Sequence, residues 1–452
     1  MKKLIILIII CTSFSCTEKL ELKPSSSTIL PTTIKDLELI LDNIDVMNVT
    51  MALPQLSADE YFIPNREDWE ALSTATARNS YIWAKDIYEG ETKVADWRIP
   101  YASIFYCNNV LDILSKKDVD NDSQLKVLKG WALFARSYSF YCLVSTFSKA
   151  YNPATASTDL GISLKLSAGI DEIVQRSTVE KTYSQIINDA LEAAELLNQN
   201  IINGKRNRPS KVAAYAFLAR VYISMRMYDK AEIYSDKCLS IYSKLTDFNT
   251  LNKTASSAFS YDDDEIIYFT KQISSYSQIT YGLSNSYGID PDLIASYDPS
   301  DLRLPIYFRK NTIGNYNTKP INNRSQVPFS GLATDEVYLI KAECLARRDE
   351  KDEALIVLND LVRTRTSGTY TPIIANTAED VLEKVLTERR KALIWRSLRW
   401  TDLKRLNLEG RNITLTRNLQ GVTYSLEPNS PRYILPIPDD EIALSGVIQN
   451  LR

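Results

Sequence analysis

Apolar residues recur every three or four positions along most of the chain, which is the period of an α-helix with one buried face. Ser177 and Glu180 have the spacing of a capping box at one helix start. The predicted helices cover residues 33–42, 97–114, 124–147, 177–197, 211–242 and 334–365. The pattern therefore predicts a mostly α-helical protein.

Two of these segments repeat the same spacing of small and apolar residues. The two sets are Ala219, Tyr222, Ala231 and Cys238, and Ala342, Leu345, Ala354 and Leu361. Small residues are needed where two helix backbones cross closely, and this spacing is typical of tetratricopeptide repeats. We expect a tetratricopeptide-like helical scaffold whose two copies are separated by a long insertion.

The insertion covers residues 247–331, where the helical period fails. Residues 265–270, EIIYFT, have the character of a β-strand, and many tyrosines lie among Ser, Asn, Gly and Pro. Long loops in an otherwise regular fold often carry function. This part is expected to be irregular, with minor β structure.

Near the C-terminus, residues 387–410 read as one helix with many charges beside its apolar stripe. Leu386, Leu393 and Trp400 recur every seven residues. Arg399, Asp402 and Arg405 follow at three-residue spacing, so Asp402 can contact an arginine on either side. These charges either form a solvated face or tie the helix to its neighbours through arginine–carboxylate pairs, and we predict the second for Arg399 and Asp402.

Composition excludes several classes of function. Lys and Arg number 53 against 56 Asp and Glu, so no basic excess indicates nucleic acid binding. Histidine is absent, which removes Ser-His-Asp and Cys-His catalysis and imidazole metal sites. The 13 glycines are too widely spaced for a Rossmann or P-loop motif. The six cysteines form no C-x-x-C pair, and the four within helical segments are expected to be buried, with a disulfide left open.

The N-terminus has the character of a targeting segment. Two lysines precede an unbroken Leu/Ile run that is too short to span a bilayer, and small residues then precede Cys16. This order predicts a signal peptide over 1–15, lipidation of Cys16 and a polar tether over 16–31. The predicted body covers 32–452, divided into an N-terminal part (32–246), the insertion (247–331) and a C-terminal part (332–452).

Several stretches resemble the SusD/RagB family of outer-membrane nutrient-binding lipoproteins. The C-terminal match consists of Glu388-Arg389-Arg390, Arg399-Trp400, Asp402-Leu403 and Arg405. The family usually has Glu, Glu, Gly and His at the positions occupied here by Ala392, Arg396, Ser397 and Leu398. Further similar stretches are CTEKLELKPS after the leader, residues 97–114, DLGISL, DPSDLR and the closing RYILPIPDDEIALSGVIQN.

The resemblance implies a binding protein, not an enzyme, without a cofactor or a metal. It implies lipid anchoring at Cys16, exposure at the cell surface, and delivery of an oligosaccharide or oligopeptide to a SusC-type TonB-dependent transporter. A lipoprotein scaffold that binds other proteins through its tetratricopeptide-like helices is the alternative. Spacing alone does not rule out a glycosidase with a carboxylate pair, because acidic residues are numerous.

Ligand contacts are expected where aromatic residues lie outside the helical period. Trp and Tyr rings can stack on the C–H face of a sugar while polar side chains bind its hydroxyls. The resemblance adds that such contacts lie in an early loop and in the insertion, which we expect to converge. The predicted ligand-binding residues are Trp69, Arg78, Asn79, Tyr81, Trp83, Tyr276, Tyr281 and Tyr287. Packing inside the fold is the alternative role for each ring.

The acidic run at residues 262–265 has oxygen ligands of the kind that Ca²⁺ prefers. A solvated turn before a strand explains the same run, and we predict no metal there.

Overall fold

The structure, a computed structural model, describes residues 33–169, 171–280, 282–320 and 327–452. The predicted signal peptide, Cys16 and the tether lie outside these residues, as does Tyr281. Within the described residues there are eighteen α-helices and twelve short strands. None of these helices has the length and apolar character needed to cross a membrane.

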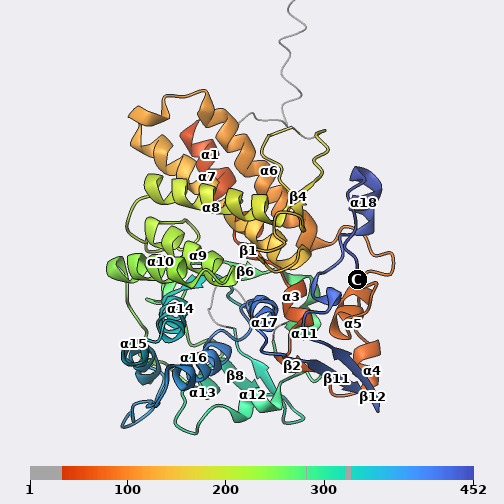
Figure 1. The fold of residues 1–452 in the computed structure, drawn as a ribbon, viewed down its shortest axis with the longest axis vertical. Helices are drawn as coiled ribbons and strands as arrows, with labels where there is room; N and C mark the ends of the chain where they lie inside the picture. The colour runs from red at the N-terminus through yellow and green to blue at the C-terminus, as the bar shows by residue number, and fades with distance from the viewer. Residues whose placement is uncertain (1–32, 170, 281, 321–326) are drawn as a thin grey trace, which may run out of the picture.

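Helices form most of the regular structure, as the hydrophobic period predicted (Figure 1). The helices up to the insertion are α1 (Ile34–Leu41), α2 (Ile44–Met47), α3 (Leu53–Ser57), α4 (Arg66–Glu70), α5 (Ala75–Tyr81), α6 (Ala95–Ser115), α7 (Ser123–Phe147), α8 (Val179–Leu196), α9 (Lys211–Ser224) and α10 (Tyr228–Ile241). Those that follow are α11 (Ser277–Thr280), α12 (Pro291–Ala295), α13 (Arg303–Tyr307), α14 (Thr334–Arg347), α15 (Lys351–Arg363), α16 (Ala378–Ala392), α17 (Arg399–Leu408) and α18 (Asp439–Ser445).

The strands form two-stranded sheets that join distant parts of the chain. The one parallel pair among the described strands is β1 (Val49–Thr50) with β6 (Lys271–Gln272). The antiparallel pairs are β2 (Tyr61–Phe62) with β7 (Gly288–Ile289), β3 (Leu160–Ser163) with β4 (Arg176–Thr178), β5 (Ile266–Tyr268) with β10 (Leu332–Ala333), β8 (Phe308–Lys310) with β9 (Tyr316–Thr318), and β11 (Leu415–Leu419) with β12 (Val422–Leu426). Much of the minor β structure therefore lies in the insertion, as predicted.

Polar side chains at the caps fix several helix starts. The Asp122 carboxylate accepts hydrogen bonds from the backbone N–H groups of Gln124 and Leu125 at the start of α7. The predicted capping box at Ser177 and Glu180 is wrong by one residue. Thr178 caps α8 instead, by accepting from Lys181 N, because the preceding residues pair as strand β4 with β3.

The helices pack as successive neighbours through the molecule. The stack runs from α6 and α7 through α8, α9 and α10 to α14, and α14 contacts both α15 and α16 (Figure 1). The two segments with repeated spacing thus lie side by side in space, although the insertion separates them in sequence. Ala219, Ala231, Ala342 and Ala354 are all fully buried, which is consistent with a tetratricopeptide-like arrangement.

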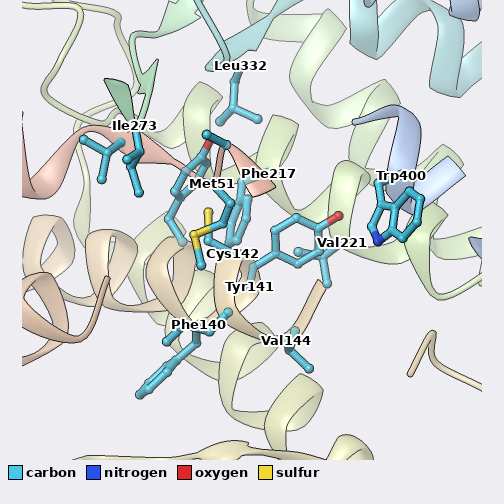
Figure 2. Packing of buried hydrophobic residues seen from close by; sticks show 14 of the residues in the cluster. Met51, Phe140, Tyr141, Cys142, Val144, Phe217, Val221, Ile273, Leu332 and Trp400 are labelled. Carbon is cyan, nitrogen blue, oxygen red and sulfur yellow. The ribbon is translucent and has the colours of Figure 1, made fainter. Parts of the chain in front are cut away.

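The largest apolar cluster extends through most of the molecule, and part of it lies between α7 and α9. Tyr141 and Cys142 of α7 lie beside Phe217 and Val221 of α9, and Trp400 of α17 closes one side (Figure 2). The four cysteines within the described residues are buried and form no disulfide, so they act as small apolar side chains.

The prediction of one helix over 387–410 is wrong, because α16 ends at Ala392 and α17 begins at Arg399. Trp395 and Ser397 adopt left-handed backbone conformations between them, with φ of 65° and 58°. Tertiary partners replace the helical hydrogen bonds here. Glu60 Oε2 accepts from Trp395 N at 3.2 Å, and Gln272 Nε2 donates to Trp395 O at 2.8 Å. The break turns the Trp395 ring into the core.

Candidate functional site

The early loop, which contains the predicted contact residues from Trp69 to Trp83, meets the insertion (residues 247–331). We call the region where they meet the aromatic junction. Strand β2 pairs with β7, with Tyr61 opposite Ile289. Ser73 N also donates a hydrogen bond to Gln278 Oε1 at 2.8 Å. The two stretches that were expected to carry ligand contacts are therefore neighbours, as the sequence interpretation required.

Most of the predicted contact residues are buried at this junction. Exposed fractions are 7% for Asn79 and Tyr276, 1% for Tyr81 and Trp83, and 0% for Tyr287. Trp83 Nε1 donates to Ser57 O at 2.9 Å, and the Tyr81 hydroxyl accepts from Ile63 N at 2.9 Å. The prediction that these rings form an exposed stacking surface is wrong, because both their faces and their polar atoms have partners within the protein.

Arg417 of β11 is the reason that the aromatic group is closed. Its guanidinium lies 4.3 Å from the ring centroid of Tyr81, 4.9 Å from that of Tyr61 and 5.4 Å from that of Trp83. The same guanidinium donates to the backbone carbonyls of Tyr61 and Ala58. A cation from the protein itself thus takes the position that we expected for a ligand.

Tyr287 is enclosed in a different way. Its ring stacks on Trp395 at 5.8 Å between centroids, and its hydroxyl donates to Gly282 O at 2.8 Å. On β11, Arg417 lies two residues from both Leu415 and Leu419, so the three side chains share one face of the strand. This pattern in the sequence could have indicated that Arg417 points inward. No sequence signal indicated which aromatic rings it covers.

Trp69 and Arg78 retain part of their surface at the rim of this junction. Trp69 Nε1 donates to Arg78 O at 2.9 Å, and Arg78 Nη1 donates to Leu72 O at 2.5 Å. These bonds hold both side chains in place, Trp69 at the end of α4 and Arg78 in the middle of α5. The rim therefore combines a fixed indole with a partly exposed guanidinium.

Ion pairs tie this junction to the C-terminal helices. Asp59 forms a two-bond pair with Arg399 of α17, with distances of 2.7 and 2.8 Å. Arg390 of α16 bridges Asp59 to Asp290 at 3.4 and 3.2 Å. Burial by itself raises the pKa of Asp59, but the guanidinium groups of Arg399, Arg390 and Arg417 together outweigh burial and hold that pKa well below its usual value. The early loop, the insertion and both C-terminal helices are thus joined at Asp59.

Asp402 has a structural position, as predicted, although its partners differ in part. It accepts from Arg389 Nε and from Arg405 Nε, both at 2.8 Å. Arg405 also forms a two-bond pair with Glu343 of α14. The predicted contact between Arg399 and Asp402 is replaced by the pair between Arg399 and Asp59. Burial opposes ionisation of Asp402, yet the two arginines lower its pKa to about 2.

The acidic run at 262–265 does not converge on one point. Asp262 accepts from Gly204 N, Asp263 from Thr246 Oγ1, and Asp264 pairs with Lys244. Glu265 pairs with the buried Arg365 at 2.5 Å. The described residues contain no group of three or more His, Cys, Asp or Glu side chains placed to hold a metal ion.

These features define a helical scaffold that carries a polar and aromatic junction at its surface, held by buried arginine–carboxylate pairs. Two protein-family models match the chain. The first, described as "Starch-binding associating with outer membrane", matches residues 18–223, and the second, described as "SusD family", matches residues 303–451. The chain belongs to the SusD family.

Solved structures share the fold. A SusD superfamily protein from Bacteroides thetaiotaomicron is 20% identical, with 93% of this chain and 100% of that chain covered and a TM-score of 0.73. One from Bacteroides fragilis is 19% identical, with 92% and 98% covered and a TM-score of 0.74. A SusD-like carbohydrate binding protein from Bacteroides vulgatus is 19% identical, with 92% and 97% covered and a TM-score of 0.70. No curated protein matches the chain in sequence.

Proposed function

We propose that this protein captures an oligosaccharide at the outer membrane and delivers it to a TonB-dependent transporter of the SusC type. Membership of the SusD family supports the proposal, as does the description of one family model as starch-binding. The similar protein from Bacteroides vulgatus is described as carbohydrate binding. Binding of a glycan, without chemical change of it, is the function that these relatives favour.

The observation that carries the proposal for this chain is the rim at the junction of the early loop and the insertion. Trp69 offers a partly exposed indole whose orientation is fixed by its hydrogen bond to Arg78 O. An indole can cover the apolar face of a pyranose, and the neighbouring Arg78 can donate to its hydroxyls. We place the ligand against Trp69 and Arg78, while Tyr281, which lies outside the described residues, stays a predicted ligand contact.

Membrane attachment through Cys16 completes the proposal. A multiply acylated cysteine would anchor the chain stably, because each buried methylene adds about 0.8 kcal/mol of membrane affinity. The polar tether after Cys16 would let the helical body approach a transporter in the same membrane.

A panel of immobilised oligosaccharides and oligopeptides, probed with the purified protein, tests this function. We expect saturable binding to one class of oligosaccharide. Binding to peptides alone would make the protein an oligopeptide carrier. Binding to neither class, with capture of a partner protein through the stacked helices, would instead favour the scaffold interpretation and overturn the proposal.

A further inference from the structure

A cavity beside α17 shares no lining residue with the aromatic junction. It has a volume of about 540 Å³, which is within the usual range for small-molecule sites. Its walls come from the segment after α7, from α17 and from residues 429–434. Leu408, Pro431, Ile434 and Leu451 give it apolar walls.

Lys404 lines this cavity and is almost fully buried, with 7% of its surface exposed. Its ammonium group donates to Ser145 O at 2.9 Å and to Ser148 O at 2.7 Å. These carbonyls belong to the end of α7, where a cation is favourable. An ammonium group has three N–H donors, so these two hydrogen bonds leave one donor for another acceptor.

No carboxylate among the described residues balances this charge. Burial alone lowers the pKa of Lys404 to about 7, without an opposing contribution from an acidic group. The acid that lines the same cavity, Asp159, is engaged elsewhere. It accepts from Lys149 Nζ and from Thr155 Oγ1, both at 2.6 Å.

Helix capping accounts for two donors of Lys404, but it does not account for a buried cation without an anion beside an apolar cavity. An anion in the cavity would give the Lys404 ammonium group the favourable charge–charge interaction that it lacks among its present contacts. The largely apolar walls favour a ligand whose remaining part is apolar as well.

We propose that this cavity binds a small carboxylate with an apolar body, with its carboxylate on Lys404 and its apolar part against Leu408, Pro431 and Ile434. The site is separate from the junction at Trp69, and the proposal does not depend on glycan binding.

Calorimetric titration of the purified protein with octanoate, compared with uncharged 1-octanol, tests this site. Octanoate should bind at least tenfold more tightly than octanol. Lys404→Met should remove that preference while leaving octanol binding unchanged, and the exposed-site control Lys244→Met should behave as the parent. If octanoate has no advantage over octanol in the parent, the proposal is overturned.

A second variant covers the case in which Lys404→Met fails to fold. Leu408→Trp narrows the cavity without removing a charge, so it should weaken both probes at least tenfold while the protein remains folded by circular dichroism. Undiminished octanoate binding to folded Leu408→Trp would place the probe elsewhere and overturn the assignment.

The pH dependence of octanoate affinity gives an independent readout. Lys149, Asp159 and Tyr433 are the other titratable side chains that line the cavity, and burial raises the pKa of Tyr433. Octanoate affinity should fall as the pH rises above about 7, because Lys404 then loses its proton in the free protein. Octanol affinity should not change. A flat octanoate profile between pH 6 and pH 8.5 would contradict a contact with Lys404.

Discussion

Asp402 lies between Arg389 and Arg405, so one carboxylate joins the end of α16 to the middle of α17. Asp402→Ala would leave two buried guanidinium groups without this partner. Breaking a buried pair in this way costs about 3–5 kcal/mol. We expect a loss of that size in the free energy of unfolding, measured by urea denaturation at pH 7.

The exposed pair between Arg363 and Asp360 provides the control, because Asp360→Ala should shift the urea midpoint far less. The contribution of Asp402 should also depend on pH. Its folded pKa of about 2 is below the ordinary value of 3.8, so its stabilisation is present above pH 4 and is lost as the pH falls toward 2. A stable Asp402→Ala variant would show that the pair is dispensable.

Glu60 should make the stability of the protein depend on pH in the opposite direction to Asp402. It is buried against Gln55 and Trp395 N, and burial raises its pKa from 4.5 to about 7. The folded state therefore binds the proton more tightly than the unfolded state does. Stability from this group is present below pH 4.5 and is lost as the pH rises toward and through 7.

Glu60→Gln should remove this loss while keeping a hydrogen-bond acceptor for Trp395 N. As the pH rises from 4.5 to 8, the difference in the free energy of unfolding between variant and parent should change by on the order of 3 kcal/mol in favour of the variant. Thermal or urea unfolding at both pH values measures the difference. Parallel pH profiles for the two proteins would show that Glu60 titrates normally.

At the scale of elements, the alanines of the stacked helices are fully buried where α9, α10, α14 and α15 pack. Ala219→Leu should overpack such a crossing and lower the free energy of unfolding by about 1–3 kcal/mol. The exposed Ala443→Leu on α18 should change it by less than about 0.5 kcal/mol. If Ala219→Leu unfolds at the same urea concentration as the parent, the crossing is looser than its burial indicates.

The elements that depend on local sequence could be predicted. Long helices such as α7 follow from an apolar period and a capping residue, both of which are local. The break between α16 and α17 could not be predicted in this way. The seven-residue recurrence of Leu386, Leu393 and Trp400 continues across it, and the partners that stabilise the break, Glu60 and Gln272, are distant in sequence.

At the scale of the whole molecule, the sequence indicated that the early loop and the insertion belong together, and they meet at β2 and β7. It did not indicate the burial of Tyr81 and Trp83. Strand β11 comes from more than 300 residues further along the chain, and Arg417 fills the space between these rings. Aromatic residues outside a helical period are equally compatible with a binding surface and with a cation-filled core, and only the tertiary fold decides between them.

Anchoring is a property of the whole chain that can be tested independently of the ligand. Cys16→Ala should move the protein from the membrane pellet to the soluble fraction after ultracentrifugation, or block its processing, because no lipid could then be attached. Cys11→Ala, within the predicted leader, is the matched control and should remain in the membrane fraction. Membrane recovery of Cys16→Ala equal to that of the parent would place the anchor elsewhere.

The central claim, that a glycan binds at the rim of the aromatic junction, is tested most directly by calorimetric titration of Trp69→Ala with the oligosaccharide selected from the panel. A stacking aromatic ring contributes about 1–3 kcal/mol when it is covered, so the variant should bind at least about tenfold more weakly than the parent. Tyr106→Ala, which removes an exposed ring on α6, should bind as the parent does. Parent-like affinity in folded Trp69→Ala would contradict this placement of the ligand.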